Sequence, residues 1–286
     1  MFKLIKANGL TKEELQAIKE LEEDCNSYEK LNMKLNWDML ESRAKNQVND
    51  LLYYEDDKLI GFLGMYGFGS NPKEIEITGM VHPHYRRKGV FKELVSEAKE
   101  HCKKNKAERI LLITERRIDS GIGFGKAIGS KYSFSEYRMK FNESKIPSFE
   151  SRGIFLEKAD IKDKKELSKL DREFFGLPEV NDEEGSSDEN EYRTTYIAEM
   201  EGKVIGKIGI TMDGEDGYIF GFGIKQEHRR KGYGRIVLSL VIEKLLKDNI
   251  NSIILEVASE NDKALGLYKS CGFKESTIYD YYKLDV

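Results

Sequence analysis

One short basic sequence occurs twice in this chain, 143 positions apart, and this repeat limits the possible folds more than any other feature. The first copy is YRRKGVFK, from Tyr85 to Lys92, and the second is HRRKGYGR, from His228 to Arg235. An apolar run precedes each copy, and a helical pattern follows it. Self-similarity at a fixed distance is typical of a duplicated architecture. The sequence therefore predicts two copies of one fold.

The other elements of each half agree with this duplication. Apolar residues at helical spacing predict helices over residues 12–23 and after the first copy, and apolar runs predict strands within 50–67, over 74–81 and over 109–114. The same order recurs with helices over 163–175 and 235–247 and strands over 192–200, 204–212, 218–224 and 252–257. Strand, loop, helix and strand in this order predict a parallel crossover.

The length of the chain suits two domains, because 286 residues correspond to about two domains of ordinary size. The polar stretch 142–153 interrupts the pattern and predicts a boundary, with one domain over 1–145 and the other over 150–286. A second irregular stretch, 179–191, is acidic. It is interpreted either as a solvated loop or as a rim that attracts a cationic substrate.

Composition excludes several functional classes. The 47 Lys and Arg residues are balanced by 51 Asp and Glu residues, whereas nucleic-acid binding usually requires a broad positive surface. No apolar run approaches the roughly 20 residues of a membrane span, and the first residues, MFKLIKA, lack the apolar core of a secretory signal. The three cysteines are odd in number and far apart, which favours a reducing compartment. We therefore expect a cytoplasmic protein without nucleic-acid or membrane partners.

Two further motifs are interpreted as structural. His82 and His84 lie close together, but no Cys or carboxylate stands at ligand spacing, so a solvated turn is favoured over a metal site. The run GIGFGKAIG, at 121–129, resembles a dinucleotide fingerprint with the wrong third spacing. It is predicted to form a loosened turn.

The repeated loop has the composition of an anion site. A glycine-rich turn between a strand and a helix leaves backbone N–H groups unpaired at the positive end of the helix. In the second copy, Gly232 and Gly234 allow positive φ angles and close approach of a phosphate. Basic side chains surround them: Arg229, Arg230, Lys231 and Arg235. A basic helix start beside a glycine also arises from simple capping, so this loop alone does not specify a ligand.

The residues that follow the second loop make the pattern more specific. Glu256 lies in the apolar strand, Asn261 begins a helix, Tyr268 follows seven residues later, and Gly272 precedes Phe273 at the end of that helix. Together with the spacing Arg-x-x-Gly-x-Gly at 229–234, these residues resemble the GNAT acyltransferase superfamily, and most closely its ribosomal-protein alanine N-acetyltransferases. The specific match covers about residues 218–284. The first half resembles the same fold with a weaker motif.

The resemblance implies a fold and a cosubstrate. It implies an α/β (mixed α+β) protein with two tandem domains, each a mixed, mostly antiparallel sheet flanked by helices, that uses acetyl-CoA and no metal. The implied binding groups are the backbone of Phe222, Gly223 and Ile224 for the pantetheine arm, Arg229 and the amides of Arg230, Lys231, Gly232, Tyr233, Gly234 and Arg235 for the pyrophosphate, and Asn261 near the sulfur.

Two side chains receive catalytic roles through the same resemblance. Tyr268 is expected to give a proton to the departing thiolate, and its alternative is a helix tyrosine packed on the sheet. Glu256 is expected to accept the proton of the attacking amine, because a carboxylate in an apolar strand is costly without a use. The alternative for Glu256 is an Arg or Lys partner across the sheet. A strand amide near residues 222–224 is expected to bind the oxyanion.

The first copy lacks these groups. In register with the second copy, Phe91 stands at the position of Gly234, Gly125 at that of Tyr268 and Ile118 at that of Asn261. The first domain is therefore predicted to be non-catalytic, either structural or a binder of acetyl-CoA. The leading hypothesis is an N-acetyltransferase acting on a peptide α-amine or a small amine in the second domain, and the rival is an acetyl-CoA sensor without acyl transfer. The sequence does not indicate an oligomeric state.

Overall fold

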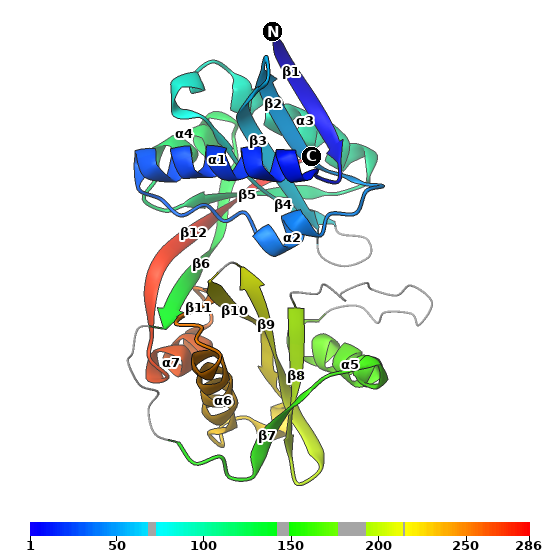
Figure 1. Ribbon diagram of the computed structural model, residues 1–286, viewed down its shortest axis with the longest axis vertical. Helices are drawn as coiled ribbons and strands as arrows, with labels where there is room; N and C mark the ends of the chain where they lie inside the picture. The colour runs from blue at the N-terminus through cyan, green and yellow to red at the C-terminus, as the bar shows by residue number, and fades with distance from the viewer. Residues whose placement is uncertain (68–72, 142–148, 177–192, 214) are drawn as a thin grey trace. The chain divides into compact units, whose positions relative to one another are not determined.

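A computed structural model describes residues 1–67, 73–141, 149–176, 193–213 and 215–286 (Figure 1). The acidic stretch 179–191 lies outside the described residues. The chain divides into two compact units. The first contains Met1–Ser135 and Thr277–Val286, and the second contains Glu136–Ser276.

The first unit is a sheet with strand order β1-β2-β3-β4-β5-β12. Neighbouring strands are antiparallel except for the parallel pair β4 and β5. The strands are β1 (Phe2–Asn8), β2 (Val48–Glu55), β3 (Lys58–Gly67), β4 (Glu74–Val81), β5 (Arg109–Glu115) and part of β12 (Phe273–Asp285). The helices are α1 (Lys12–Glu29), α2 (Trp37–Glu41), α3 (Val90–Lys104) and α4 (Asp119–Ala127), with a short 3-10 helix η1 (Pro83–Tyr85).

The second unit repeats this plan with strand order β6-β11-β10-β9-β8-β7. Only β10 and β11 are parallel. The strands are β6 (Lys131–Phe141), β7 (Ile154–Lys158), β8 (Arg193–Met200), β9 (Lys203–Asp213), β10 (Asp216–Ile224) and β11 (Ser252–Ala258). The helices are α5 (Lys164–Phe175), α6 (Tyr233–Lys247) and α7 (Asp262–Ser270), with short 3-10 helices η2 (Ile161–Asp163) and η3 (Gln226–His228). The predicted fold class, in which each domain is a mixed and mostly antiparallel sheet flanked by helices, is confirmed.

The two units exchange a strand. Strand β12 begins in the second unit and pairs with β5 in the first, from Tyr279 opposite Glu115 to Asp285 opposite Arg109. Strand β6 begins in the first unit and pairs with β11 in the second. The sequence-based division at residues 145–150 assigns the last strand, β12, to the second domain. In the structure, most of β12 pairs with β5 and completes the sheet of the first unit.

Each sheet contains one fork. Strands β4 and β5 pair only as far as Ile77 opposite Leu112, and β10 and β11 pair only as far as Ile219 opposite Leu255. Beyond these residues the two parallel strands diverge. The basic loops follow the ends of β4 and β10, so each loop lies next to the open end of its fork.

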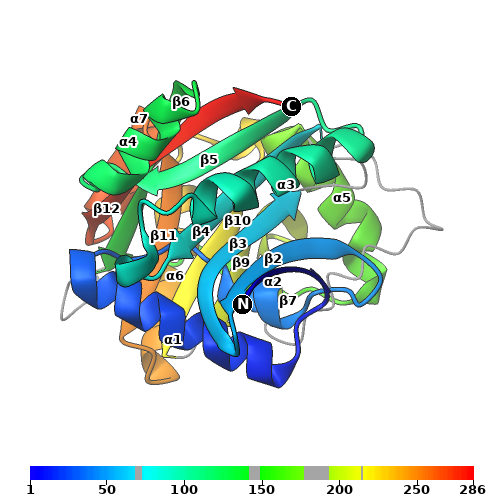
Figure 2. The same ribbon diagram turned by 90° about the horizontal axis from the view of Figure 1, so that it is seen from above.

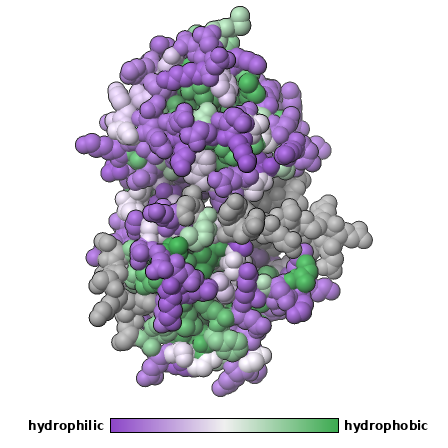
Figure 3. Space-filling model, viewed as in Figure 1, coloured by the Kyte–Doolittle hydropathy of each residue, from purple (hydrophilic) through white to green (hydrophobic). Residues whose placement is uncertain are grey.

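Helices cover both faces of the first sheet, with α1 on one face and α3 on the other (Figure 2). Successive residues of β4 alternate between them, because Met80 packs in the cluster of α1 and Val81 in the cluster of α3. On the face shown in Figure 3, hydrophilic residues cover most of the first unit, and hydrophobic residues are visible over the second.

One expectation about local structure was wrong. The run at 121–129 does not form a loosened turn, because most of it belongs to the helix α4. A side chain at Gly121 would clash here, since its Cβ would lie 2.0 Å from the Thr114 hydroxyl of β5. The glycine therefore permits close packing of a helix on the sheet, and this packing outweighs the low helix propensity of glycine.

Candidate acyl-transfer site

The two basic loops have the same backbone conformation. The φ angles are 64° at Arg87 and 63° at Arg230, and they are 90° at Gly89 and 85° at Gly232. Each glycine is the N-cap of its helix, α3 or α6, and has no side-chain cap. The first-turn amides of both helices consequently point toward the loop, where they can bind an anion.

The first arginine of each loop has a structural task. The Nε of Arg86 donates to the carbonyl of Val81 at 3.0 Å, and the Nε of Arg229 donates to the carbonyl of Ile224 at 2.8 Å. Each bond ties the loop to the end of the preceding strand. Positive charge in the second loop therefore comes from one tethered arginine and from three exposed side chains, Arg230, Lys231 and Arg235.

The strand before the second loop carries a β-bulge. Phe220 pairs with Gly209 and Gly223 with Lys207, so Gly221 and Phe222 together face one residue of β9. Gly221 has a φ of 55°, which favours glycine. A bulge takes a backbone amide out of the regular ladder, and bulges are common next to active sites. The strand β4 of the first unit pairs regularly with β3 from Ile75 to Val81.

Tyr268 lies on α7 and is buried, with 9% of its surface exposed. Its ring contacts Phe273 edge to face, with centroids 6.2 Å apart. Burial raises the pKa of Tyr268 to about 12, so the phenol stays protonated at neutral pH. The tyrosine thus packs in the core of the second unit and also keeps a proton to donate.

Glu256 has the cross-strand partner that its alternative interpretation anticipated. It lies opposite Arg138 in the pairing of β11 with β6. The Nε and Nη2 atoms of Arg138 both lie 3.0 Å from Oε1 of Glu256. The two side chains are 13% and 21% exposed for Arg138 and Glu256, respectively. This ion pair sits just beyond the last paired residues of the fork, at Ile219 and Leu255.

Asn261 performs a local structural role at the start of α7. Its Oδ1 accepts a hydrogen bond from the amide of Ala264 at 3.2 Å, which makes it the N-cap. The residue is exposed. Asn261 and Tyr268 therefore lie at opposite ends of the same short helix.

The apparent defect of the first loop is compensated inside the fold. Phe91 replaces Gly234, but Gly79 replaces Phe222 at the matching position of the strand. A Cβ at Gly79 would lie 2.8 Å from the Phe91 ring, and one at Gly234 would lie 3.8 Å from the Phe222 ring. Each unit therefore fills the space between the strand and the following helix with one phenylalanine ring. The helix α3 supplies this ring in the first unit, and the strand β10 supplies it in the second. Phe91 points at the strand and also packs on Phe124 of α4, with ring centroids 4.8 Å apart.

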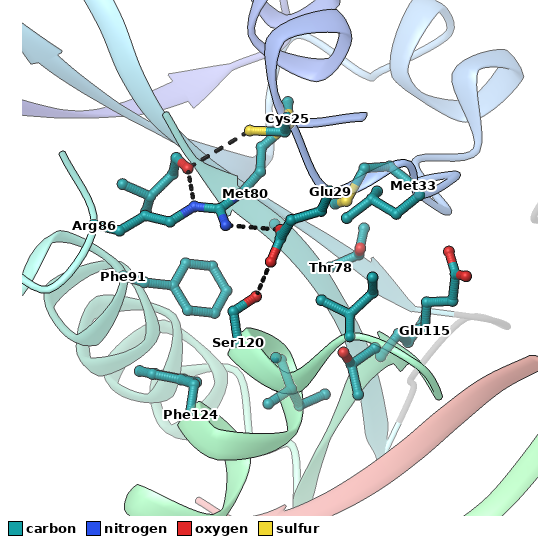
Figure 4. A pocket seen from close by; sticks show the side chains of 18 of the residues that line it. Cys25, Glu29, Met33, Thr78, Met80, Arg86, Phe91, Glu115, Ser120 and Phe124 are labelled. Atoms are coloured by element: carbon teal, nitrogen blue, oxygen red, sulfur yellow. Dashed lines mark hydrogen bonds and ion pairs between the residues drawn. The ribbon is translucent and has the colours of Figure 1, made fainter. Parts of the chain in front are cut away.

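The first unit also contains a cavity of about 440 Å³ that the sequence did not reveal (Figure 4). Its walls include the first loop, both strands of the fork, and the helices α1, α3 and α4. In its wall, Glu29 forms an ion pair with Nη1 of Arg86 at 2.7 Å and accepts a hydrogen bond from Ser120 at 2.8 Å. Glu29 comes from the end of α1, far from the repeat in sequence, so only the tertiary structure brings it to the loop.

The described residues also bear on membrane spans and metal sites. No described helix is long and apolar enough to cross a membrane. Among the same residues, no group of three or more His, Cys, Asp or Glu side chains is arranged to hold a metal ion.

Comparisons with known proteins agree with the duplicated fold. The Acetyltransferase (GNAT) family model matches residues 15–120 and 163–273. The alanine N-acetyltransferase of ribosomal protein bS18 from Escherichia coli K12 is 34% identical over 64 residues, which cover 22% of this chain and 43% of that protein. The match thus spans less than half the length of this curated relative.

Two solved structures resemble nearly the whole chain. A GCN5-related N-acetyltransferase from Sphaerobacter thermophilus has a TM-score of 0.78 at 16% identity, over 99% of this chain and 95% of that one. A tandem GNAT protein from the clavulanic acid biosynthesis pathway has a TM-score of 0.73 at 14% identity, over 100% and 98%. At such identities the likeness concerns the fold. Because the family model covers most of both units, this chain belongs to the acetyltransferase (GNAT) family.

Proposed function

We propose that this protein transfers an acetyl group from acetyl-CoA to a primary amine and that the chemistry takes place in the second unit. The observation that carries the proposal is the presence of three features in the second unit. These are an anion-binding loop with Gly232 at positive φ, the bulge at Gly221, and the buried, protonated Tyr268. The first unit has a similar loop and fork but no bulge in β4 and no tyrosine on α4.

Each feature has a place in an acyl transfer. The loop amides hold the pyrophosphate of acetyl-CoA, and the diverging backbone at Phe222, Gly223 and Ile224 pairs with its pantetheine arm. The amine attacks the thioester carbonyl carbon, and a bulge amide stabilises the oxyanion. As the carbon–sulfur bond breaks, Tyr268 donates its proton to the thiolate. Glu256 accepts the proton of the attacking amine, directly or through water.

The acceptor is a primary amine of low pKa. An α-amine, with an ordinary pKa of about 7.7 to 8.0, is partly neutral at pH 7, whereas a lysine amine near 10.4 requires stronger base assistance. Glu256 is the carboxylate that we assign as the base, and it already forms an ion pair with Arg138. The relative from Escherichia coli acts, by its name, on an alanine of a ribosomal protein. Peptides with a free amino terminus are therefore the first acceptors to test.

The experiment is to screen peptides and small amines for release of CoA thiol and to compare Tyr268→Phe with the native protein. We expect the variant to lose at least about 100-fold in kcat. Unchanged turnover in this variant would place the chemistry elsewhere.

A second candidate function is binding of a CoA thioester by the first unit without transfer. The observation in its favour is the cavity of about 440 Å³ beside an equivalent loop. Calorimetric titration with acetyl-CoA tests it, since a stoichiometry near two sites per chain supports binding in both units and a value near one limits binding to a single unit.

A further inference from the structure

The cavity of the first unit passes through the fork from one face of the sheet to the other. On the α3 face its wall includes Phe91, which packs against Gly79 of β4. On the α1 face it includes Cys25, Met33 and Met80. We call the part bounded by these three residues the α1 chamber (Figure 4). Anything that enters the fork from the loop therefore projects into this chamber.

The charged side chains of the α1 chamber are satisfied within the protein. Glu29 is held by Arg86 and Ser120. Glu115 accepts a hydrogen bond from the amide of Asn32 at 3.1 Å and forms an ion pair with Arg117.

The buried Lys34 donates to the Tyr281 hydroxyl at 2.6 Å. A ligand that enters the chamber thus meets charges that already have partners.

Most of the remaining wall of the chamber is apolar and adaptable. Cys25, Leu31, Met33, Met80 and Ile113 make up the apolar part, beside the polar Asn32 and Thr78. Burial raises the pKa of Cys25 to about 11, so its thiol is neutral. Methionine side chains are flexible and polarisable, and they adjust to ligands of different shape. Such a wall suits a hydrocarbon chain better than an ammonium group.

The second unit differs at the equivalent position. Gly223 is the counterpart of Met80 in the repeat, and a Cβ there would lie 2.1 Å from the Phe174 ring of α5. The aromatic ring therefore lies directly against the diverging strand. At the same point of the fork, the first unit has an open chamber and the second has a phenylalanine.

We propose that the α1 chamber binds the acyl chain of a CoA thioester longer than acetyl, as a ligand and not as a donor for transfer. The proposal rests on the proposed function in one respect, namely that these loops hold CoA. It assigns the two units different acyl groups. The second unit binds the short acetyl group, because Phe174 occupies the space that a longer acyl chain would need. The first unit binds an acyl chain long enough to fill the space between Met33 and Met80.

Chain length gives the proposal a measurable signature. Burial of each additional methylene in an apolar chamber tightens binding about fourfold. We therefore expect affinity at one class of site to rise from acetyl- through butanoyl- to hexanoyl-CoA, and then to level off as the chamber fills. Affinity at the second class of site is expected to stay constant or to fall with chain length.

The experiment is calorimetric titration of the full chain with CoA, acetyl-, butanoyl-, hexanoyl- and octanoyl-CoA. In Met80→Phe a larger side chain fills the chamber, and the rise with chain length is expected to disappear while acetyl-CoA binding persists. Met33→Phe narrows the same chamber from a less buried position. It is expected to have the same effect, so it replaces Met80→Phe if that variant does not fold. Phe174→Leu, at the equivalent place in the second unit, is the matched control and is expected to preserve the rise.

The outcomes separate this inference from the proposed function. If acetyl-CoA binds but longer thioesters bind no more tightly, the chamber assignment is overturned and the proposed function stands. The assignment is also overturned if Phe174→Leu changes the dependence of affinity on chain length while Met80→Phe and Met33→Phe leave it unchanged. If no thioester binds at all, the proposed function itself fails.

Discussion

The guanidinium of Arg138 holds the carboxylate of Glu256 across neighbouring strands, with both nitrogen contacts at 3.0 Å. Arg138 belongs to β6, the strand that the first half of the chain contributes to the second unit. The residue that we assign as the base is therefore positioned by a strand outside its own half of the sequence.

The Arg138–Glu256 pair predicts different results for its two roles. Removal of either partner from this mostly buried pair is expected to lower the free energy of unfolding by roughly 1–3 kcal/mol. As base, Glu256 also contributes to turnover, so Glu256→Gln is expected to lose more kcat than Arg138→Gln at equal destabilisation. Denaturant unfolding and steady-state kinetics measure the two effects. Equal losses of kcat would leave Glu256 with a purely structural role.

Tyr268 predicts a pH-dependent stability. The unfolded tyrosine releases its proton near its ordinary pKa of about 10, whereas the folded one keeps it until about pH 12. The stability of the native protein therefore falls as pH rises from about 10 to about 12, and Tyr268 accounts for about 3 kcal/mol of that fall. In Tyr268→Phe the fall is expected to be smaller by this amount. Denaturant midpoints measured from pH 9 to pH 12 for both proteins test the difference.

The two loop glycines predict separable losses of binding. A β-branched residue at positive φ is strained, so Gly89→Val and Gly232→Val are each expected to lose about 1–3 kcal/mol of stability. Each variant is also expected to lose the thioester site of its own unit, as read from calorimetric stoichiometry. Gly202→Val is the control, because its φ of 71° imposes the same strain in a turn between β8 and β9. Loss of a site in the control would show that strain alone explains the effect.

The exchange of phenylalanine and glycine predicts strong coupling between two positions. In the second unit, Gly234→Phe is expected to destabilise the fold, because Phe222 already occupies the space beside it. Phe222→Gly alone leaves a cavity and is also expected to cost stability. The double variant reproduces the arrangement of Gly79 and Phe91 in the first unit, so it is expected to recover part of both losses. Additive losses in this double-mutant cycle would contradict the compensation.

The strand exchange predicts that the first half does not fold by itself. Without residues 277–286, a fragment of residues 1–145 exposes the edge of β5 and loses the stacking of Phe134 on Tyr281, whose centroids are 4.3 Å apart. It also loses Asp280, which accepts a bond from Ser135 at 2.6 Å. We expect the fragment to lack a cooperative unfolding transition. Fusion of residues 277–286 to it through a linker is expected to restore one, and cooperative unfolding of the bare fragment would contradict the prediction.

The sequence determined the duplicated fold, because the repeated loop and the spacing of apolar residues around it can be recognised without knowing any tertiary contact. It also predicted that Tyr268 and Glu256 act beside the second loop, and this assignment stays a prediction. Local propensity was misleading at Gly121, where close packing on Thr114 makes the glycine a helix residue.

Tertiary structure alone decided the features that depend on contacts between distant segments. The partner of Glu256 comes from β6, and Glu29 reaches the first loop from α1. The spacing of residues in the sequence does not encode either contact, because strand exchange and helix packing place them. The same holds for Phe91, because the sequence does not show that Gly79 of β4 lies beneath its ring. A large side chain on one element can be balanced by a small one on the element that packs against it, and the sequence does not show which elements pack together.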